Sequence, residues 1–177
     1  MRLGDHMPNL TVTSQNGQFS LSEATFSSWS VVMFHPCAFT SVCSTEMRSI
    51  AQLQAEERMP SIRFFSVMPN GADRIAALVK ELTADSLFPV LHDCISDPAG
   101  ELTRAFGLPV AKEDEIGPRG YFIFGPAGVL KSYQILPTVV GFSSTELLRL
   151  VSALQLVRHG EMYAPADWQP GHELLSV

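Results

Sequence analysis

The chain of 177 residues lacks the patterns that define several large classes of protein. Its three cysteines are an odd number with no CxxC pair, which argues against a secreted disulfide framework and a structural zinc site. The net charge is −6 with no basic block, so nothing indicates a nucleic-acid or anionic-membrane partner. No apolar run approaches the length of a membrane span, and the N-terminus lacks the apolar core of a signal peptide. We therefore expect a soluble, cytoplasmic protein.

The composition that remains is that of an ordinary folded protein. Hydrophobic residues make up 46% of the chain and charged residues 17%, and the length suits a single core. The tail from His159, with Pro165, Pro170 and Gly171, has weak periodicity. We expect one domain over residues 1–158, followed by a short C-terminal arm over residues 159–177.

Hydrophobic periodicity predicts an α/β fold. An N-terminal hairpin is expected where two short strands flank Asn16-Gly17, a strong turn signal. Asn70 is expected to cap a helix over residues 71–82. Further strands are predicted at residues 31–34, 62–67, 89–92, 121–124 and 129–133, and further helices from about residue 43, at 100–106 and at 143–154. Early alternation of strands and helices and a late hairpin predict a mixed central sheet flanked by helices.

Cys43 is the residue that most clearly carries chemistry. It follows an apolar strand and a proline-containing loop, and it stands where a helix begins. Unpaired N–H groups and the helix dipole at such a site favour thiolate over thiol, and the thiolate is the nucleophile. This is a thioredoxin-like arrangement without its second cysteine. Thr40 lies about one turn earlier, where its hydroxyl can reach the thiolate or a substrate oxygen.

The stretch from Pro36 to Cys43 matches the PxxxTxxC signature of the peroxiredoxins, the alkyl hydroperoxide reductase/thiol-specific antioxidant family. The resemblance covers nearly the whole chain and points to the one-cysteine branch, although the sequence ends at Val177, earlier than such relatives do. Other matching segments are Leu3-Gly4-Asp5, Phe34-His35-Pro36, Thr45-Glu46, Phe122-Ile123-Phe124-Gly125-Pro126, Leu154-Gln155-Leu156 and Pro165-Ala166-Asp167-Trp168.

The resemblance implies roles for four residues and a thioredoxin-like fold. Cys43 would be the peroxidatic cysteine that becomes a sulfenic acid. Thr40 would orient the peroxide, and Pro36 would shield the thiolate from water. Arg119, at the start of a late strand, would lower the pKa of the thiol and polarise the O–O bond. No metal, haem, flavin or other cofactor is implied.

Two further residues have alternative explanations. Glu46 follows Cys43 by one helical turn, where it would either anchor an active-site arginine or complement the helix dipole. His35 matches the one-cysteine branch, and it would either tune the thiol or contact substrate, or simply pack at a strand end. The other histidines show no metal-ligand spacing.

The chain departs from the family pattern at several positions. Tyr163 and Ala164 stand about where two-cysteine relatives carry the resolving cysteine, and Phe142 stands where a second active-site arginine is expected. Cys37, in the active-site loop, is a candidate resolving residue if the start of the helix unwinds, or it merely fills space in the loop. Cys94 is a further candidate, or else a packed or surface thiol, and a one-cysteine mechanism is the remaining alternative.

These observations predict a thiol peroxidase that reduces hydrogen peroxide and small organic hydroperoxides. Its partners would be the peroxide and a thiol reductant such as thioredoxin, glutaredoxin or glutathione. The resemblance also implies a homodimer, with assembly into rings as an extension. The alternative function is a peroxide-responsive redox sensor or chaperone-like protein with weak turnover.

Overall fold

The computed structural model describes residues 1–56, 58, 61–111, 116–157 and 160–176. It divides into two compact units, Met1–Gly141 and Phe142–Val177. The boundary expected between residues 158 and 159 lies outside the described residues, so the expected domain and arm stay predictions. No described helix is both long enough and apolar enough to cross a membrane.

The first unit is built on a seven-stranded mixed sheet with the strand order β2-β1-β5-β4-β3-β6-β7. The middle strand β4 pairs in parallel with β3 on one side and with β5 on the other, and the other pairings are antiparallel. This confirms the α/β class and the N-terminal hairpin. The strands are β1 (Thr11–Ser14), β2 (Gly17–Ser20), β3 (Trp29–Phe34), β4 (Ile62–Met68), β5 (Asp93–Ser96), β6 (Arg119–Phe124) and β7 (Leu130–Leu136).

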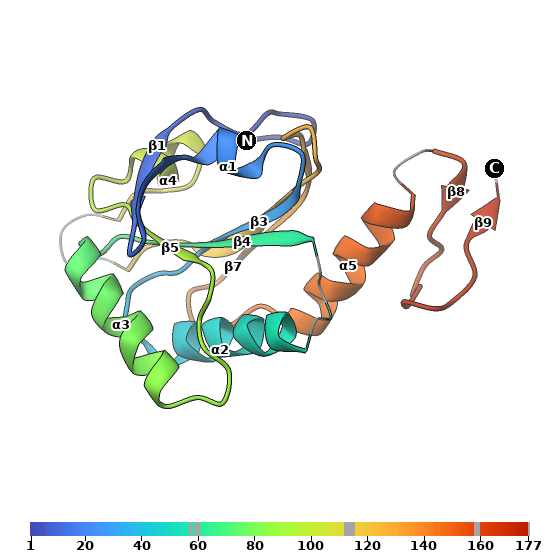
Figure 1. Ribbon diagram of the computed structural model, residues 1–177. Helices are drawn as coiled ribbons and strands as arrows, with labels where there is room; N and C mark the ends of the chain where they lie inside the picture. The colour runs from blue at the N-terminus through green and yellow to red at the C-terminus, as the bar shows by residue number, and fades with distance from the viewer. Residues whose placement is uncertain (57, 59–60, 112–115, 158–159, 177) are drawn as a thin grey trace. The chain divides into compact units, whose positions relative to one another are not determined.

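Helices cover both faces of this sheet (Figure 1). On one face lie α2 (Ser41–Ala55) and α3 (Ala72–Ala84), and on the other lie α1 (Leu21–Thr25) and α4 (Glu101–Ala105). Side chains of a strand alternate between faces. In β4, Phe65 and Val67 belong to the cluster with α1 and α4, whereas Met68 belongs to the cluster with α2 and α3. Ser66 therefore points to the face that α2 covers.

Two local predictions are wrong. Asn70 does not cap α3, whose N-cap is Gly71, because the Asn70 side-chain oxygen accepts a hydrogen bond from Ala38 N at 2.6 Å. The strand expected at residues 89–92 lies instead at Asp93–Ser96. Its position is set by the parallel register with β4 and by Gln15, whose Oε1 accepts from Cys94 N at 2.7 Å. Neither partner is visible in the local hydrophobic pattern.

The second unit contains α5 (Ser144–Leu156) and a small hairpin of β8 (Met162–Tyr163) and β9 (Leu175–Ser176). Ser143 caps α5, because its hydroxyl accepts from Glu146 N at 3.2 Å. Arg149 pairs with Glu146 and donates to the Trp168 carbonyl at 3.3 Å. The helix and the following chain are thus tied together within this unit.

Four phenylalanines form the centre of the core on the α1 and α4 face. Phe106 packs against Phe34 at 5.0 Å, against Phe122 at 4.9 Å and against Phe124 at 5.9 Å between ring centroids. Three of these four rings stand on neighbouring central strands, and Phe106 follows α4. This cluster packs on one face of β3, and the active site is built on the opposite face.

We expect Phe106→Ala to lower the free energy of unfolding by about 3–5 kcal/mol, because it leaves a cavity among three rings. Phe26→Ala is the matched control, since the Phe26 side chain is 70% exposed. Urea denaturation followed by circular dichroism measures both variants. Equal losses in the two variants would show that this cluster does not carry the stability assigned to it.

Candidate active site

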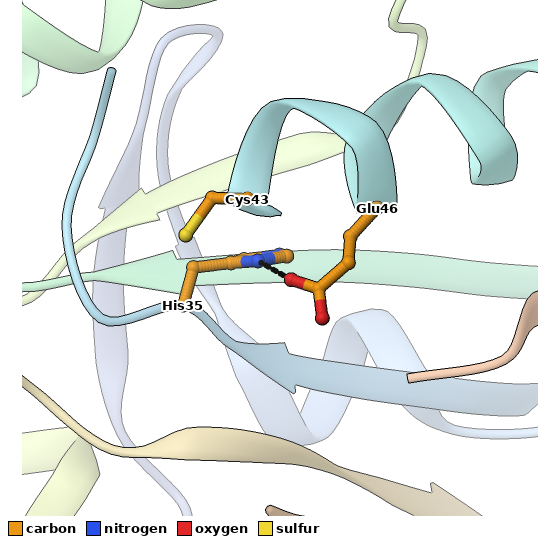
Figure 2. A group of neighbouring side chains, drawn as sticks. All are labelled: His35, Cys43 and Glu46. Carbon is orange, nitrogen blue, oxygen red and sulfur yellow. Dashed lines mark hydrogen bonds and ion pairs between the residues drawn. The ribbon is translucent and has the colours of Figure 1, made fainter. Parts of the chain in front are cut away.

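Cys43 lies in the first turn of α2 and is fully buried. The helix begins after Thr40, which is its N-cap, so the thiol stands among the first backbone N–H groups, as the sequence predicts. Glu46 lies one turn further along the same helix. Residues three apart share a helix face, and Figure 2 shows Cys43 and Glu46 directed toward His35.

His35 extends the parallel ladder of β3 by one residue, because its N–H donates to Val67 O at 2.9 Å. Its ring is fully enclosed: Nδ1 lies 3.0 Å from Glu46 Oε2, and Nε2 lies 3.0 Å from Ser66 Oγ. The ionised Glu46 carboxylate only accepts hydrogen bonds, so Nδ1 carries a proton and donates it. His35 is therefore a fixed donor in the site, which goes beyond packing at a strand end.

Arg119 reaches the same cluster from β6. The antiparallel register pairs Phe34 with Gly120, and one further step places Arg119 beside His35. Its Nη2 donates to Cys43 Sγ at 3.6 Å, and its Nη1 donates to Glu46 Oε2 in a close ion pair. Its Nε donates to Thr138 O at 3.0 Å. The guanidinium, 2% exposed, is thus held from both sides and aimed at the sulfur.

Glu46 holds both cations through one atom. Its Oε2 accepts from the His35 imidazole and from the Arg119 guanidinium. The geometry favours the role of arginine anchor over complementing the helix dipole. Arg119 is thus a guanidinium partner for Glu46.

The pKa of the Cys43 thiol is lowered from the ordinary value of 9.0 to about 7. Burial alone raises it, but the hydrogen bond and the charge of His35 outweigh burial, with smaller help from the Thr40 hydroxyl and the Cys37 backbone. The pKa of His35 is raised: burial lowers it, and this is outweighed by hydrogen bonds and charge interactions with Cys43 and Glu46. Each group stabilises the charged form of the other.

The loop before α2 holds the remaining predicted residues. Thr40 is half-buried, and its hydroxyl donates to Cys37 O at 3.1 Å. The same proton, turned toward Cys43, stabilises the thiolate. Pro36 is buried, and its carbonyl accepts from Gly117 N at 3.1 Å. Phe39 has a φ of 63°, a left-handed conformation that is strained for a bulky residue.

The other two cysteines differ in their surroundings. Cys37 is half-buried, and its sulfur accepts from Asn70 Nδ2 at 3.7 Å. Cys94 is buried in β5, and its thiol donates to His92 O at 3.8 Å. Burial raises the pKa of Cys94, so it stays a thiol at neutral pH. Of the two, Cys37 has the better position to meet Cys43.

His35, Cys43 and Glu46 each offer one ligand atom, and these atoms lie within 4.8 Å of one another. Such a trio resembles the ligand set of a soft divalent cation. Here, however, the Arg119 guanidinium already donates to both Cys43 and Glu46, so a cation would have to displace it. The cluster suits stabilisation of a thiolate better than metal binding.

Sequence reasoning missed Ser66, His92 and Gln54, which continue the hydrogen bonding behind His35. Ser66 is fully buried in the apolar run of β4. In the sequence, the one serine within this apolar run was the signal that could have identified Ser66. The sequence does not indicate that Ser66 contacts His92, because the two residues are far apart along the chain.

Comparison with protein-family models matches residues 3–133 to the AhpC/TSA family. The chain belongs to this family. It is a peroxiredoxin, that is, a thiol-dependent peroxidase, as the motif around Cys43 predicts.

Individual relatives cover nearly all of this peroxiredoxin. The Peroxiredoxin-6 of Mus musculus is 30% identical over 99% of this chain and 82% of its own length. The 1-Cys peroxiredoxin of Medicago truncatula is 27% identical over 99% of this chain and 83% of its own length. These similarities confirm the expected resemblance to the one-cysteine branch.

Solved structures agree with the fold. A cysteine-to-serine mutant of the Peroxiredoxin 6 of Arenicola marina has a TM-score of 0.91 and 26% identity, covering 100% of this chain and 84% of its own. The yeast mitochondrial 1-Cys peroxiredoxin has a TM-score of 0.87 and 21% identity, covering 98% of this chain and 85% of its own. The thioredoxin-like architecture of the family is thus confirmed.

The pKa assigned to Cys43 predicts a pH profile. Because the thiolate reacts, alkylation of Cys43 by iodoacetamide should increase with an inflection at about pH 7 and level off above it. In His35→Asn, burial is no longer opposed by the imidazolium, so the inflection should move to higher pH. The measurement uses the Cys37→Ser background, and His6→Asn, at an exposed position, is the control. An unshifted profile in His35→Asn would contradict the assignment.

Proposed function

We propose that this peroxiredoxin reduces hydrogen peroxide and small organic hydroperoxides through Cys43, with Arg119, Thr40 and Pro36 as the other active-site residues. The observation that carries the proposal is the position of Arg119, which contacts both Glu46 and the Cys43 sulfur from a distant strand. A guanidinium fixed beside a thiolate leaves further N–H donors for peroxide oxygens. Glu46 and His35 have supporting roles, because Glu46 anchors Arg119 and His35 lowers the pKa of Cys43.

The first step is a two-electron transfer from sulfur to peroxide. The Cys43 thiolate attacks one oxygen of ROOH, an S–O bond forms and the O–O bond breaks. Sulfur becomes a sulfenic acid, and the leaving RO⁻ takes a proton to become an alcohol or water. Arg119 stabilises the charge that develops on the leaving oxygen, Thr40 orients the peroxide, and Pro36 keeps water from the thiolate.

Regeneration requires a thiol donor. A thiol attacks the sulfenic sulfur, which releases water and forms a mixed disulfide, and a second thiol then restores Cys43. Thioredoxin, glutaredoxin and glutathione are the proposed donors. The yeast mitochondrial relative is described as resolving its thiol via glutathione/thioredoxin systems, which supports this choice.

Cys37 is proposed as a resolving thiol within the same chain. Its attack on the Cys43 sulfenic acid would form a disulfide and release water, and it requires the first turn of α2 to open. Opening breaks the Thr40 bond to Cys37 O and the Ser44 N–H bond to Thr40 O, and it relieves the strain at Phe39. A stable Cys37–Cys43 disulfide would also suit the sensor alternative.

We also propose that the protein forms a homodimer. We propose a reducing compartment, such as the cytoplasm, as its location. β7 is an edge strand, and it and the chain beyond it carry exposed apolar side chains at Tyr133, Ile135, Val139 and Val140. An open edge with an apolar surface is prone to pair with a second copy. Three free cysteines fit a compartment that keeps thiols reduced.

Stopped-flow measurement of hydrogen peroxide consumption by the reduced protein tests the function. The wild type should react orders of magnitude faster than a free thiol, and Cys43→Ser should lose the reaction entirely. A wild type that reacts no faster than a free thiol would remove the peroxidase proposal and leave the sensor alternative.

The same assay tests Arg119. Arg119→Ala should raise the pKa of Cys43 and slow peroxide consumption, because both the donor to sulfur and the stabilisation of the leaving oxygen are lost. Arg48→Ala, at an exposed position of α2, is the matched control and should react as the wild type does. Equal rates in the two variants would contradict the role of Arg119.

Mass spectrometry after one equivalent of peroxide tests Cys37. If Cys37 resolves Cys43, the protein loses two hydrogens, and digestion yields a peptide pair linked through these residues. Cys37→Ser should instead accumulate sulfenic or sulfinic acid at Cys43, whereas Cys94→Ser should behave as the wild type. Only oxygen adducts on wild-type Cys43, with Cys37 unmodified, would establish the one-cysteine mechanism.

A further inference from the structure

Behind the active site, a chain of buried hydrogen bonds runs from His35 to Gln54. His35 Nε2 lies 3.0 Å from Ser66 Oγ, and Ser66 Oγ lies 2.9 Å from His92 Nε2. The other ring nitrogen of His92, Nδ1, lies 3.3 Å from Gln54 Oε1. Ser66 and His92 are buried, and Gln54 is half-buried near the end of α2. The chain therefore begins at the end of β3 and ends on α2, the helix that carries Cys43.

The direction of these hydrogen bonds follows from the Gln54 end. The Gln54 amide is oriented with its carbonyl oxygen, which only accepts, toward His92, and in this orientation His92 Nδ1 carries the proton. A neutral His92 then has a bare Nε2, which accepts the single proton of the Ser66 hydroxyl. With its proton used, Ser66 Oγ offers only lone pairs to His35 Nε2. His35 must therefore donate from Nε2.

His35 also donates from Nδ1, to Glu46, so both of its nitrogens carry protons and the ring is cationic. We propose that Gln54, His92 and Ser66 form a directed hydrogen-bond chain that holds His35 as the imidazolium beside the Cys43 thiolate. The three residues act through His35, and their described hydrogen bonds do not reach the Cys43 sulfur. They are positioning residues, and the inference rests on the proposed role of Cys43.

The surrounding charges are consistent with this protonation. His35 faces Cys43 and Glu46 from α2, Arg119 from β6 binds the same carboxylate, and His92 stands behind Ser66. The pKa of His92 is lowered to about 3 by burial first and by the charge of His35 second. Asp93 opposes this weakly, and its carboxylate is engaged by Ser14 and Asn16. A neutral His92 is what the chain requires.

The reverse direction defines the alternative state. If an N–H donor faced His92 Nδ1, the proton of His92 would move to Nε2, Ser66 would donate to His35, and His35 would become neutral. The Cys43 thiolate would then lose its cationic partner on β3. In this proposal Gln54 acts through three intervening residues, His92, Ser66 and His35, to favour the ionised nucleophile at neutral pH.

The test compares variants by the pH dependence of Cys43 alkylation in the Cys37→Ser background. Ser66→Ala and Gln54→Leu should each raise the pKa of Cys43 from about 7 to roughly 8, and slow alkylation at pH 7 about fivefold. Gln54→Glu keeps an acceptor and should restore the wild-type profile. Ser30→Ala is the matched control, because Ser30 is a buried serine of β3 with no hydrogen-bond partner among the described residues.

A structural defect would act differently. It would lower the alkylation rate at all pH values, including the plateau, whereas loss of the directed chain moves the inflection and leaves the plateau unchanged. Nitrogen-15 spectra of the histidine-labelled wild type at pH 7 give the second readout. They should show an imidazolium signal that disappears in His35→Asn, which assigns this signal to His35.

A neutral His35 in these spectra, or an unmoved inflection in both Ser66→Ala and Gln54→Leu, would overturn the proposal. Neither readout uses peroxide, so failure of the peroxidase function is recognised separately. In that case the wild type would show the low thiol pKa and the imidazolium but no rapid peroxide consumption.

Discussion

The active site depends on one shared oxygen atom. Glu46 Oε2 accepts from Arg119 and from His35, and both of these residues act on Cys43. Without that carboxylate, two cations would lie close together in a buried site and repel each other. With it, α2 is joined to β3 and to β6 at the point where the thiol must be aimed. The two cations are balanced by Glu46 and one further anion, and that anion is the Cys43 thiolate.

Two buried cysteines of the same protein show why this balance is needed. Cys94 and Cys43 are both fully enclosed, yet burial raises the pKa of the first and is overcome at the second. The difference is the cationic partner: His35 lies beside Cys43, whereas Cys94 meets a carbonyl oxygen and Asp93. Position at a helix N-terminus contributes to reactivity, but the neighbouring charges decide it.

The loop before α2 has two requirements that oppose each other. The proposed peroxide chemistry needs Thr40 and Pro36 held in place, and the hydrogen bonds to Cys37 O and from Gly117 N do this. Regeneration needs the buried Cys43 to become accessible to a second thiol. The strained conformation at Phe39, the residue before the N-cap of α2, lowers the free-energy cost of opening the loop.

The fold class and the N-terminal hairpin followed from the sequence, because strand alternation, turn residues and helix starts are local patterns, and the same patterns predict Cys43 as the nucleophile. Arg119 came only from family resemblance, since no local pattern marks an arginine that lies 76 residues from its thiol. The strand at Asp93–Ser96 was misplaced, because its register depends on β4. Only the tertiary structure brought His35, Glu46 and Arg119 to one point and placed Ser66 against His92. These contacts arise where strands and a helix distant in sequence pack together, and spacing along the chain carries no record of that packing.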